Sequence, residues 1–168
     1  MSLLDLDPFP SYNFVVTLDA ADAYLPKVQA ALVLPVALGA FKEVKGLGSE
    51  MEVTPYREGG VNDFVRQLPG SHSWGRITLS RGITRAPGLW EWYQAGLILS
   101  LGARRDGCIM LRHPDGSPAV AWTFRAGLAA KWTGPSLSAM ESAVAIEALE
   151  IAHEGLLQVQ VFGPPGGP

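Results

Sequence analysis

The chain has 168 residues, of which 48% are apolar and 17% charged, and its formal net charge is −3. This length suits a single domain, whereas 19 glycines and 13 prolines argue against a long-helix or coiled-coil protein. The longest apolar run, residues 30–41, is broken by Pro35 and Gly39, which excludes a membrane-spanning helix. Five tryptophans argue against disorder, and 13 basic against 16 acidic residues leave no basic face for nucleic acid.

The N-terminal half alternates between short apolar segments and glycine turns. Residues 12–18 place an aromatic or aliphatic side chain at every second position, which predicts a strand with one apolar face. Residues 20–38 predict a loop that contains a short helix over 26–34, closed by Pro35. Three further strands are predicted at 41–45, 49–56 and 62–68, the last of them stopped by Pro69-Gly70.

The C-terminal half begins with a strand over 74–81, and a helix is expected over about 86–98, because Pro87 suits a first helical turn. The side of this helix expected to face the core carries Leu89, Trp90, Tyr93 and Leu97. Trp92 lies roughly 200° around the helix from Trp90, so it is expected to face outward.

Residues 106–112 and 119–124 predict a hairpin around the turn Pro114-Asp115-Gly116. Residues 142–153 are ambiguous: alanine and glutamate favour a helix, whereas alternating Val and Ile allow a strand. Residues 163–168 form a Gly/Pro tail that we expect to be mobile. Many short strands and one helix predict a mostly β fold, a small antiparallel barrel or sandwich, in one domain over 1–162.

The residues that carry enzyme chemistry do not occur in productive patterns. The single cysteine, Cys108, allows neither an internal disulfide nor a cysteine-based zinc cluster and reads as an inert thiol. The three histidines are scattered without ligand spacing, and Gly46-Leu47-Gly48 lacks the lysine and third glycine of a phosphate loop. His153-Glu154 could act as an acid or base, but the sequence shows no nucleophile for this pair to activate. We therefore expect no enzyme, and no catalytic, cofactor-binding or metal-ligating residues.

One loop combines charge and flexibility, Tyr56-Arg57-Glu58-Gly59-Gly60. Arg57 and Glu58 point apart on an extended chain, so each needs a partner elsewhere. The loop is either a solvated hairpin tip or a set of charge-assisted contacts across a subunit interface.

Several short motifs are spread over nearly the whole chain, from about residue 9 to residue 156. They are Asp7-Pro8 with Asn13-Phe14, Phe41-Lys42-Glu43-Val44-Lys45-Gly46-Leu47-Gly48-Ser49-Glu50, the Tyr56–Gly60 loop, Leu68-Pro69-Gly70, 77–82, 89–92, 122–124, Lys131-Trp132-Thr133-Gly134-Pro135, and 144–156. In this order they resemble the inner tube proteins of contractile phage tails and extracellular injection systems, which are related in fold to the type VI secretion tube protein.

The resemblance implies a ring-forming β-barrel subunit with one flanking helix, and a strand over 144–153. It implies six subunits to a ring, and rings stacked into a hollow tube that delivers cargo or DNA. The implied partners are other copies of the chain, a sheath protein, baseplate and spike hub proteins and lumen cargo, without specific nucleic-acid recognition or membrane insertion. A start without a basic signal region predicts synthesis and folding in the cytosol. The resemblance implies assembly in the bacterial cytoplasm, after which the subunit is part of a phage tail or injection particle.

Segment 43–60 is the expected ring-stacking contact, and the interface candidates are Glu43, Tyr56, Arg57, Glu58, Gly59, Gly60 and Trp92. The 20–38 loop and the tail depart from the family pattern, which leaves open a tube initiator or adaptor ring at the baseplate. A monomeric ligand-binding β-barrel is the alternative from another class of protein. Under the tube interpretation, the low charge predicts that much of the subunit surface is buried between copies.

Overall fold

The computed structural model describes residues 11, 13–19, 36–37, 41–60, 63–84, 88–98, 103–140 and 143–160. The predicted helix over 26–34 and the predicted mobile tail over 163–168 therefore lie outside the described residues. Within these ranges, no helix has the length and apolar character needed to cross a membrane.

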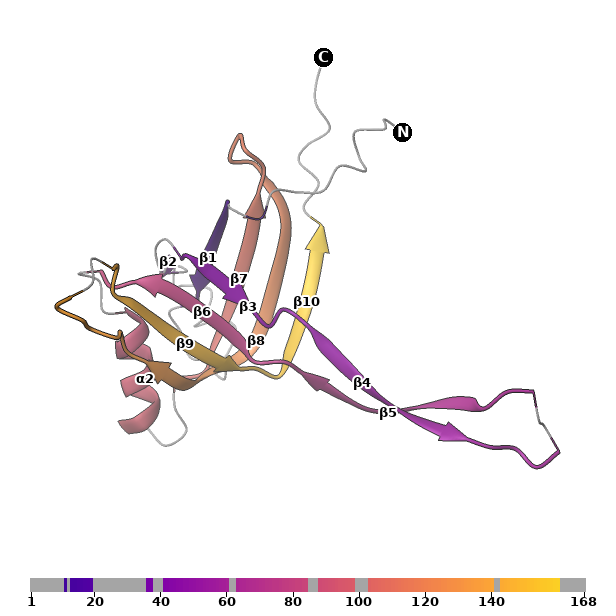
Figure 1. Cartoon of the computed structure of the whole chain (residues 1–168). Coiled ribbons are helices and arrows are strands. Elements are labelled where there is room, and N and C mark those ends of the chain that lie inside the picture. Colours follow the sequence, from indigo (N-terminus) through magenta and orange to yellow (C-terminus); the bar gives the residue numbers. More distant parts are fainter. Residues whose placement is uncertain are drawn as a thin grey trace, which may run out of the picture.

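The described chain is mostly β, with antiparallel pairing and one helix, which confirms the predicted fold class. Its elements are β1 (Phe14–Leu18), β2 (Val36–Ala37), β3 (Glu43–Lys45), β4 (Ser49–Tyr56), β5 (Arg66–Trp74), β6 (Ile77–Gly82), α2 (Gly88–Ile98), β7 (Arg105–Arg112), β8 (Pro118–Thr133), β9 (Ile146–Ala152) and β10 (Gly155–Gln160). The main sheet runs β2-β1-β7-β8-β9-β6-β3, with β10 paired to β8, while β4 and β5 form a separate two-stranded ribbon (Figure 1).

Strand β8 links the two halves of the main sheet. Its first part pairs with β7 and with β10, whereas residues 128–133 pair with β9. At the change of partner Ala126 adopts a positive φ of 49°. A register shift in the β7 pairing spans it, and a second shift, in the β9 pairing, follows between Ala129 and Lys131. Irregularities of this kind bend a strand and increase its twist. One 16-residue strand thereby serves both halves, where the sequence predicts only a short strand over 119–124.

The core lies between these two halves and under the helix. Residues of β6 and β9 alternate strictly between buried and half-buried, because alternate side chains point to opposite faces of a sheet. The largest fully buried side chains are Phe124, Ile77, Leu79, Leu89, Ile109, Leu149, Ile151 and Val16. Burial of such side chains provides most of the stability of the barrel.

The predicted helix is present as α2, but its predicted core-facing side is only partly right: Leu89 is buried and Tyr93 packs against the core, whereas Trp90 and Leu97 are exposed. Trp92 is only 3% exposed, and its indole Nε1 donates a hydrogen bond to the Ala103 carbonyl at 2.6 Å. Leu97, expected inside, is 64% exposed. The reason is that apolar residues occur nearly all round this helix, so their spacing alone leaves the buried face undetermined. The face that packs is defined by Leu89 and Trp92, three residues apart.

Two other predictions need correction. Pro69-Gly70 does not stop a strand, because β5 continues through it to Trp74. The pairing skips a residue here: Met51 faces His72, but Val53 faces Pro69, so β5 carries the extra residue of a β-bulge. A bulge on an open-edged ribbon tolerates a proline that cannot donate a hydrogen bond. Strand β10 has no counterpart among the predicted elements.

The ambiguous segment is resolved as the resemblance implies. Residues 146–152 form strand β9, paired on both sides with β6 and β8, so the helical propensity of the segment is overridden. Pairing on two sides satisfies the backbone groups that a helix would otherwise satisfy internally. The predicted turn at Pro114-Asp115-Gly116 is also present, with Gly116 at a φ of 87°.

Candidate assembly surfaces

The ribbon of β4 and β5 forms an arm that projects from the barrel (Figure 1). Every residue of β4 is exposed, as is every residue of β5 except the half-buried Trp74 at its root. The arm is tied to the barrel through Gly46, whose φ is 84° and whose hypothetical Cβ would collide with the Arg76 carbonyl oxygen. Only glycine suits that position.

The arm has two faces of different character. Register places Met51 opposite His72 and Val53 opposite Pro69, so these four side chains share one apolar face near the root. The opposite face is mixed, because Leu68 lies there opposite Thr54. There Glu52 Oε2 accepts a hydrogen bond from Ser71 Oγ at 2.8 Å, and Glu50, Thr54 and Tyr56 lie on the same side.

An isolated two-stranded ribbon is at best marginally stable in water, because it lacks a core of its own. Exposed apolar residues gathered in one place indicate a protein contact surface. On the arm they are Met51 and Val53 on one face, Tyr56 and Leu68 on the other, and Phe64 and Val65 at the tip. The arm is therefore the leading candidate for a contact with another molecule.

The tip of the arm holds five of the predicted interface residues together, Tyr56 to Gly60. Glu58 finds its partner within the same hairpin, since its Oε1 lies 2.9 Å from Arg66 Nε. Arg57 is exposed and has no ion-pair partner among the described residues. Gly60 takes a φ of 88°, which permits the reversal at the tip.

The other two predicted interface residues lie away from the tip. Glu43 is on β3 in the main sheet, where its Oε1 pairs with Lys45 Nζ at 3.0 Å. Trp92 is buried in the core, so the outward orientation predicted for it is wrong. A tryptophan in this position stabilises the subunit itself and offers no surface to a neighbour.

The outward face of β3, β6, β9 and β8 is largely polar. Register aligns Lys45, Thr78, Glu150 and Lys131 in one row across the four strands, and Glu43, Ser80, Ala148 and Thr133 in the next. Glu150 receives ion pairs from Arg76 and from Lys131, each at 3.2 Å. The hydrogen bond from Lys131, followed by that from Arg76, lowers the pKa of the Glu150 carboxyl.

This lowered pKa gives a pH-dependent prediction for Glu150→Gln. A carboxyl with a lower pKa in the folded state contributes stability above its unfolded value, near 4.5, and that contribution disappears as pH falls through the folded value. The variant should therefore melt slightly below the wild type at pH 7 and match it at about pH 2. Thermal melts at both pH values check this, and added salt should narrow the gap at neutral pH. An equal gap at both pH values would contradict the assignment.

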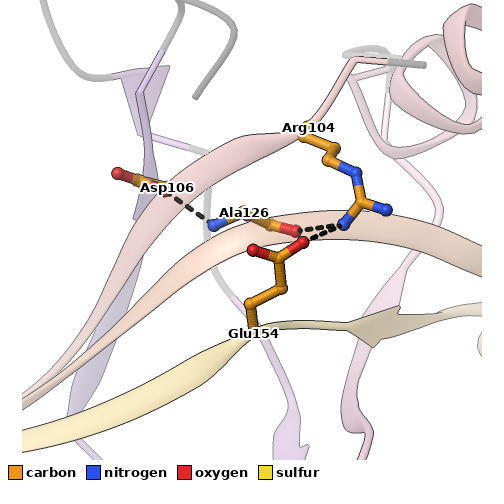
Figure 2. A network of polar contacts seen from close by, with 4 residues as sticks. All are labelled: Arg104, Asp106, Ala126 and Glu154. Carbon is orange, nitrogen blue, oxygen red and sulfur yellow. Dashed lines mark hydrogen bonds and ion pairs between the residues drawn. The ribbon is translucent and has the colours of Figure 1, made fainter. Parts of the chain in front are cut away.

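The bend in β8 is held by a network of side chains on Ala126 (Figure 2). Asp106 Oδ1 accepts a hydrogen bond from the Ala126 amide at 2.7 Å. Arg104 Nη1 donates to the Ala126 carbonyl at 3.2 Å and pairs with Glu154 Oε1 at 3.0 Å. Both backbone polar groups of the residue with positive φ are thus satisfied, so the network fixes the angle between the two halves of the sheet.

Chemistry-bearing residues are dispersed in the described part of the chain. No group of three or more His, Cys, Asp or Glu there could hold a metal ion. Cys108 is half-buried, and burial, with a smaller effect of Asp19, raises the pKa of its thiol, which opposes formation of the reactive thiolate.

The described chain combines an antiparallel β fold with an exposed two-stranded arm and a bend in β8 that polar contacts hold. The sequence model of the family described as T4-like virus tail tube protein gp19 matches residues 10–157. The chain therefore belongs to this tail tube family, as its motifs predicted. None of the curated proteins compared with the chain matches it.

Solved structures agree with this assignment. A chain of the anti-feeding prophage (AFP) baseplate structure, 6-fold symmetrised, is 26% identical with a TM-score of 0.78, and the match covers 95% of this chain and 98% of that one. A chain of the PVC sheath-tube complex in the extended state is 20% identical with a TM-score of 0.74 and coverages of 96% and 99%. The SPP1 tail tube protein shares the fold at 10% identity, with a TM-score of 0.59 and coverages of 93% and 81%.

Proposed function

We propose that this protein is the structural subunit of the inner tube of a contractile tail or injection system. Six copies form a ring, and rings stack inside a sheath into a hollow tube that delivers cargo or DNA. The observation that carries the proposal is the exposed arm of β4 and β5 on a tail tube fold. Such an arm gains a stable environment against a partner, and we assign another copy of the chain as that partner.

Ring closure needs two different surfaces that fit each other and repeat around an axis. Among the described residues, β3 pairs only with β6 and β10 pairs only with β8, so each has an edge free for a neighbouring strand. On β10 the side chains of Leu157 and Val159 are exposed beside that edge. Joining these edges between copies satisfies backbone groups that a single barrel leaves to solvent.

Stacking of rings is assigned to segment 43–60, with Arg57 and Glu58 at its tip. The further partners are the sheath, the baseplate and spike hub proteins, and cargo in the lumen. Assembly takes place in the bacterial cytoplasm, from a single domain over 1–162. A second candidate is an adaptor ring at the baseplate, favoured by the similarity to a chain of the AFP baseplate structure.

The test is assembly of the full chain with its sheath and baseplate proteins present, observed by negative-stain microscopy. We expect Arg57→Ala to keep the circular dichroism spectrum of the wild-type subunit but to shorten or abolish tubes, because an exposed cation at the tip is removed. Arg125→Ala, at an exposed arginine of β8, is the matched control and should form normal tubes.

Two outcomes count against these assignments. Normal tubes from Arg57→Ala would remove the stacking role of the tip while leaving the tube function intact. A wild-type protein that stays monomeric by mass photometry with its partners present would contradict the tube function itself.

A further inference from the structure

We infer that the tip of the arm docks into an apolar groove on a second copy of the chain, the groove that lies between β1, β3, β7 and β8. The groove has a volume of about 390 Å³ and is lined by Phe14, Val44, Leu111 and Trp122, with Lys42 and Glu43 at its β3 side. The inference rests on the proposed function and specifies which surface of the next subunit receives the arm.

The groove exists because the core is incompletely covered at this point. Strand β3 is only three residues long and pairs with β6 alone in the described chain, so the sheet ends beside it. Phe14, Val44 and Trp122 pack against the buried core but remain partly exposed. Covering them removes apolar surface from water, which is favourable without any rearrangement of the barrel.

The arm of the same copy does not fill this groove. It leaves the barrel just after β3 and points away from it (Figure 1). At about 3.4 Å per residue, the eight residues of β4 carry the tip on the order of 27 Å from its root. A tip at that distance from its root does not reach the groove of its own copy, so the groove that receives it belongs to a second copy.

The tip and the groove match in polarity. The tip presents Phe64, which is 56% exposed, beside the half-exposed ring of Tyr56. An aromatic anchor of this kind in an apolar pocket is the usual centre of a protein contact. The exposed aromatic side chains of the tip are therefore suited to fill the apolar groove.

The charges around the tip and the groove are also complementary. Asp63 and Arg57 at the tip, and Lys42 beside the groove, are exposed and have no ion-pair partner among the described residues. Docking can bring Asp63 to Lys42, and Arg57 to Glu43, whose only ion-pair partner in the described chain is Lys45. Two pairs of opposite sign fix the orientation of the tip as well as its position.

The geometry of this contact is that of a filament. The tip and the groove are different surfaces, and each copy carries one of each. A contact of this type repeats from copy to copy and propagates as an open array unless rotation closes it. It therefore acts along the tube, in addition to the strand edges that close each ring.

Disulfide trapping tests the contact directly. In a Cys108→Ser background, Phe64→Cys combined with Val44→Cys should yield a ladder of cross-linked oligomers when assembled material is oxidised and run on a non-reducing gel. Phe64→Cys combined with Leu137→Cys is the control, because Leu137 is 81% exposed and does not line the groove. Absence of a ladder in assembled tubes, or an equal ladder from the control, would overturn the inference.

Charge exchange provides the second measurement. Lys42→Glu alone and Asp63→Lys alone should each cause loss of tubes while the subunit stays folded, and the double variant should regain them. If the wild type forms tubes, but the cysteine variants give no ladder and the charge variants keep their tubes, the docking contact is refuted. The tube function then still stands. A wild type that forms no tubes with its partners present refutes both.

Discussion

Replacing Arg81 by methionine is expected to lower the free energy of unfolding by about 3–5 kcal/mol, the range measured when one partner of a buried ion pair is removed. The side chains of Arg81 and Glu147 are only 3% and 9% exposed, and Arg81 Nε lies 2.7 Å from Glu147 Oε1. Trp132 Nε1 donates to the other carboxylate oxygen at 3.1 Å. Without Arg81, the buried carboxylate loses the cation that compensates its charge. Urea denaturation at pH 7 measures the loss.

Two variants show whether burial causes this effect. The double variant Arg81→Met with Glu147→Leu should recover most of the stability, because an apolar pair of similar volume replaces both charges. Arg76→Met breaks a pair that is exposed, and it should cost no more than about 1 kcal/mol. If Arg81→Met costs as little as Arg76→Met, then the Arg81–Glu147 pair does not behave as a buried one.

This ion pair illustrates what the sequence reveals and what it leaves out. Arg81 continues the alternation of Ile77 and Leu79, and Glu147 precedes Leu149 in the same way, so both charges fall on inward positions of predicted strands. That their strands are neighbours in register depends on pairing across 66 residues of sequence, which no local pattern specifies. Alternation predicts a face, whereas pairing depends on the whole fold.

The arm shows the same division between local and long-range information. The residues of β4 were predicted to form a strand from their composition and flanking glycines, and the strand is present. Nothing in that pattern indicates that β4 and β5 project from the main sheet, because the alternation within one strand does not specify which strand it pairs with. The bulge at Pro69-Gly70 hides the continuity of β5, since the same residues usually mark the end of a strand.

The two candidate contact surfaces, the tip and the groove, also differ in how far the sequence reveals them. Tyr56 to Gly60 lie together because they are adjacent in sequence, so reading a single loop suffices to find them. The groove is assembled from β1, β3, β7 and β8, which are distant in sequence. The low proportion of charged residues is consistent with both surfaces, since large apolar side chains on the arm and on β10 are exposed in the single subunit. We expect them to be covered in the assembly.

The second large effect is expected at Phe124, whose ring is 1% exposed at the centre of the core. Phe124→Ala should lower the free energy of unfolding by about 3–5 kcal/mol, from lost burial and from the cavity left behind. The ring fills the space between two glycines near the bend of β8. A Cβ on Gly127 would lie 2.6 Å from Phe124 Cε2 and 3.0 Å from the Arg105 carbonyl oxygen, and a Cβ on Gly107 would collide with Phe124 Cζ.

A double-mutant cycle tests this packing. Gly127→Ala alone should cost about 1–3 kcal/mol, because the ring is confined on its opposite side by Gly107 and cannot move away. Added to Phe124→Ala, the same change should cost clearly less, since the added methyl group then enters the vacated space. Gly155→Ala, where a Cβ would meet nothing within 4 Å, is the control and should stay within about 0.5 kcal/mol of wild type. Fully additive costs would show that Gly127 and the ring do not determine each other, and that the cost at Gly127 comes from the Arg105 carbonyl oxygen instead.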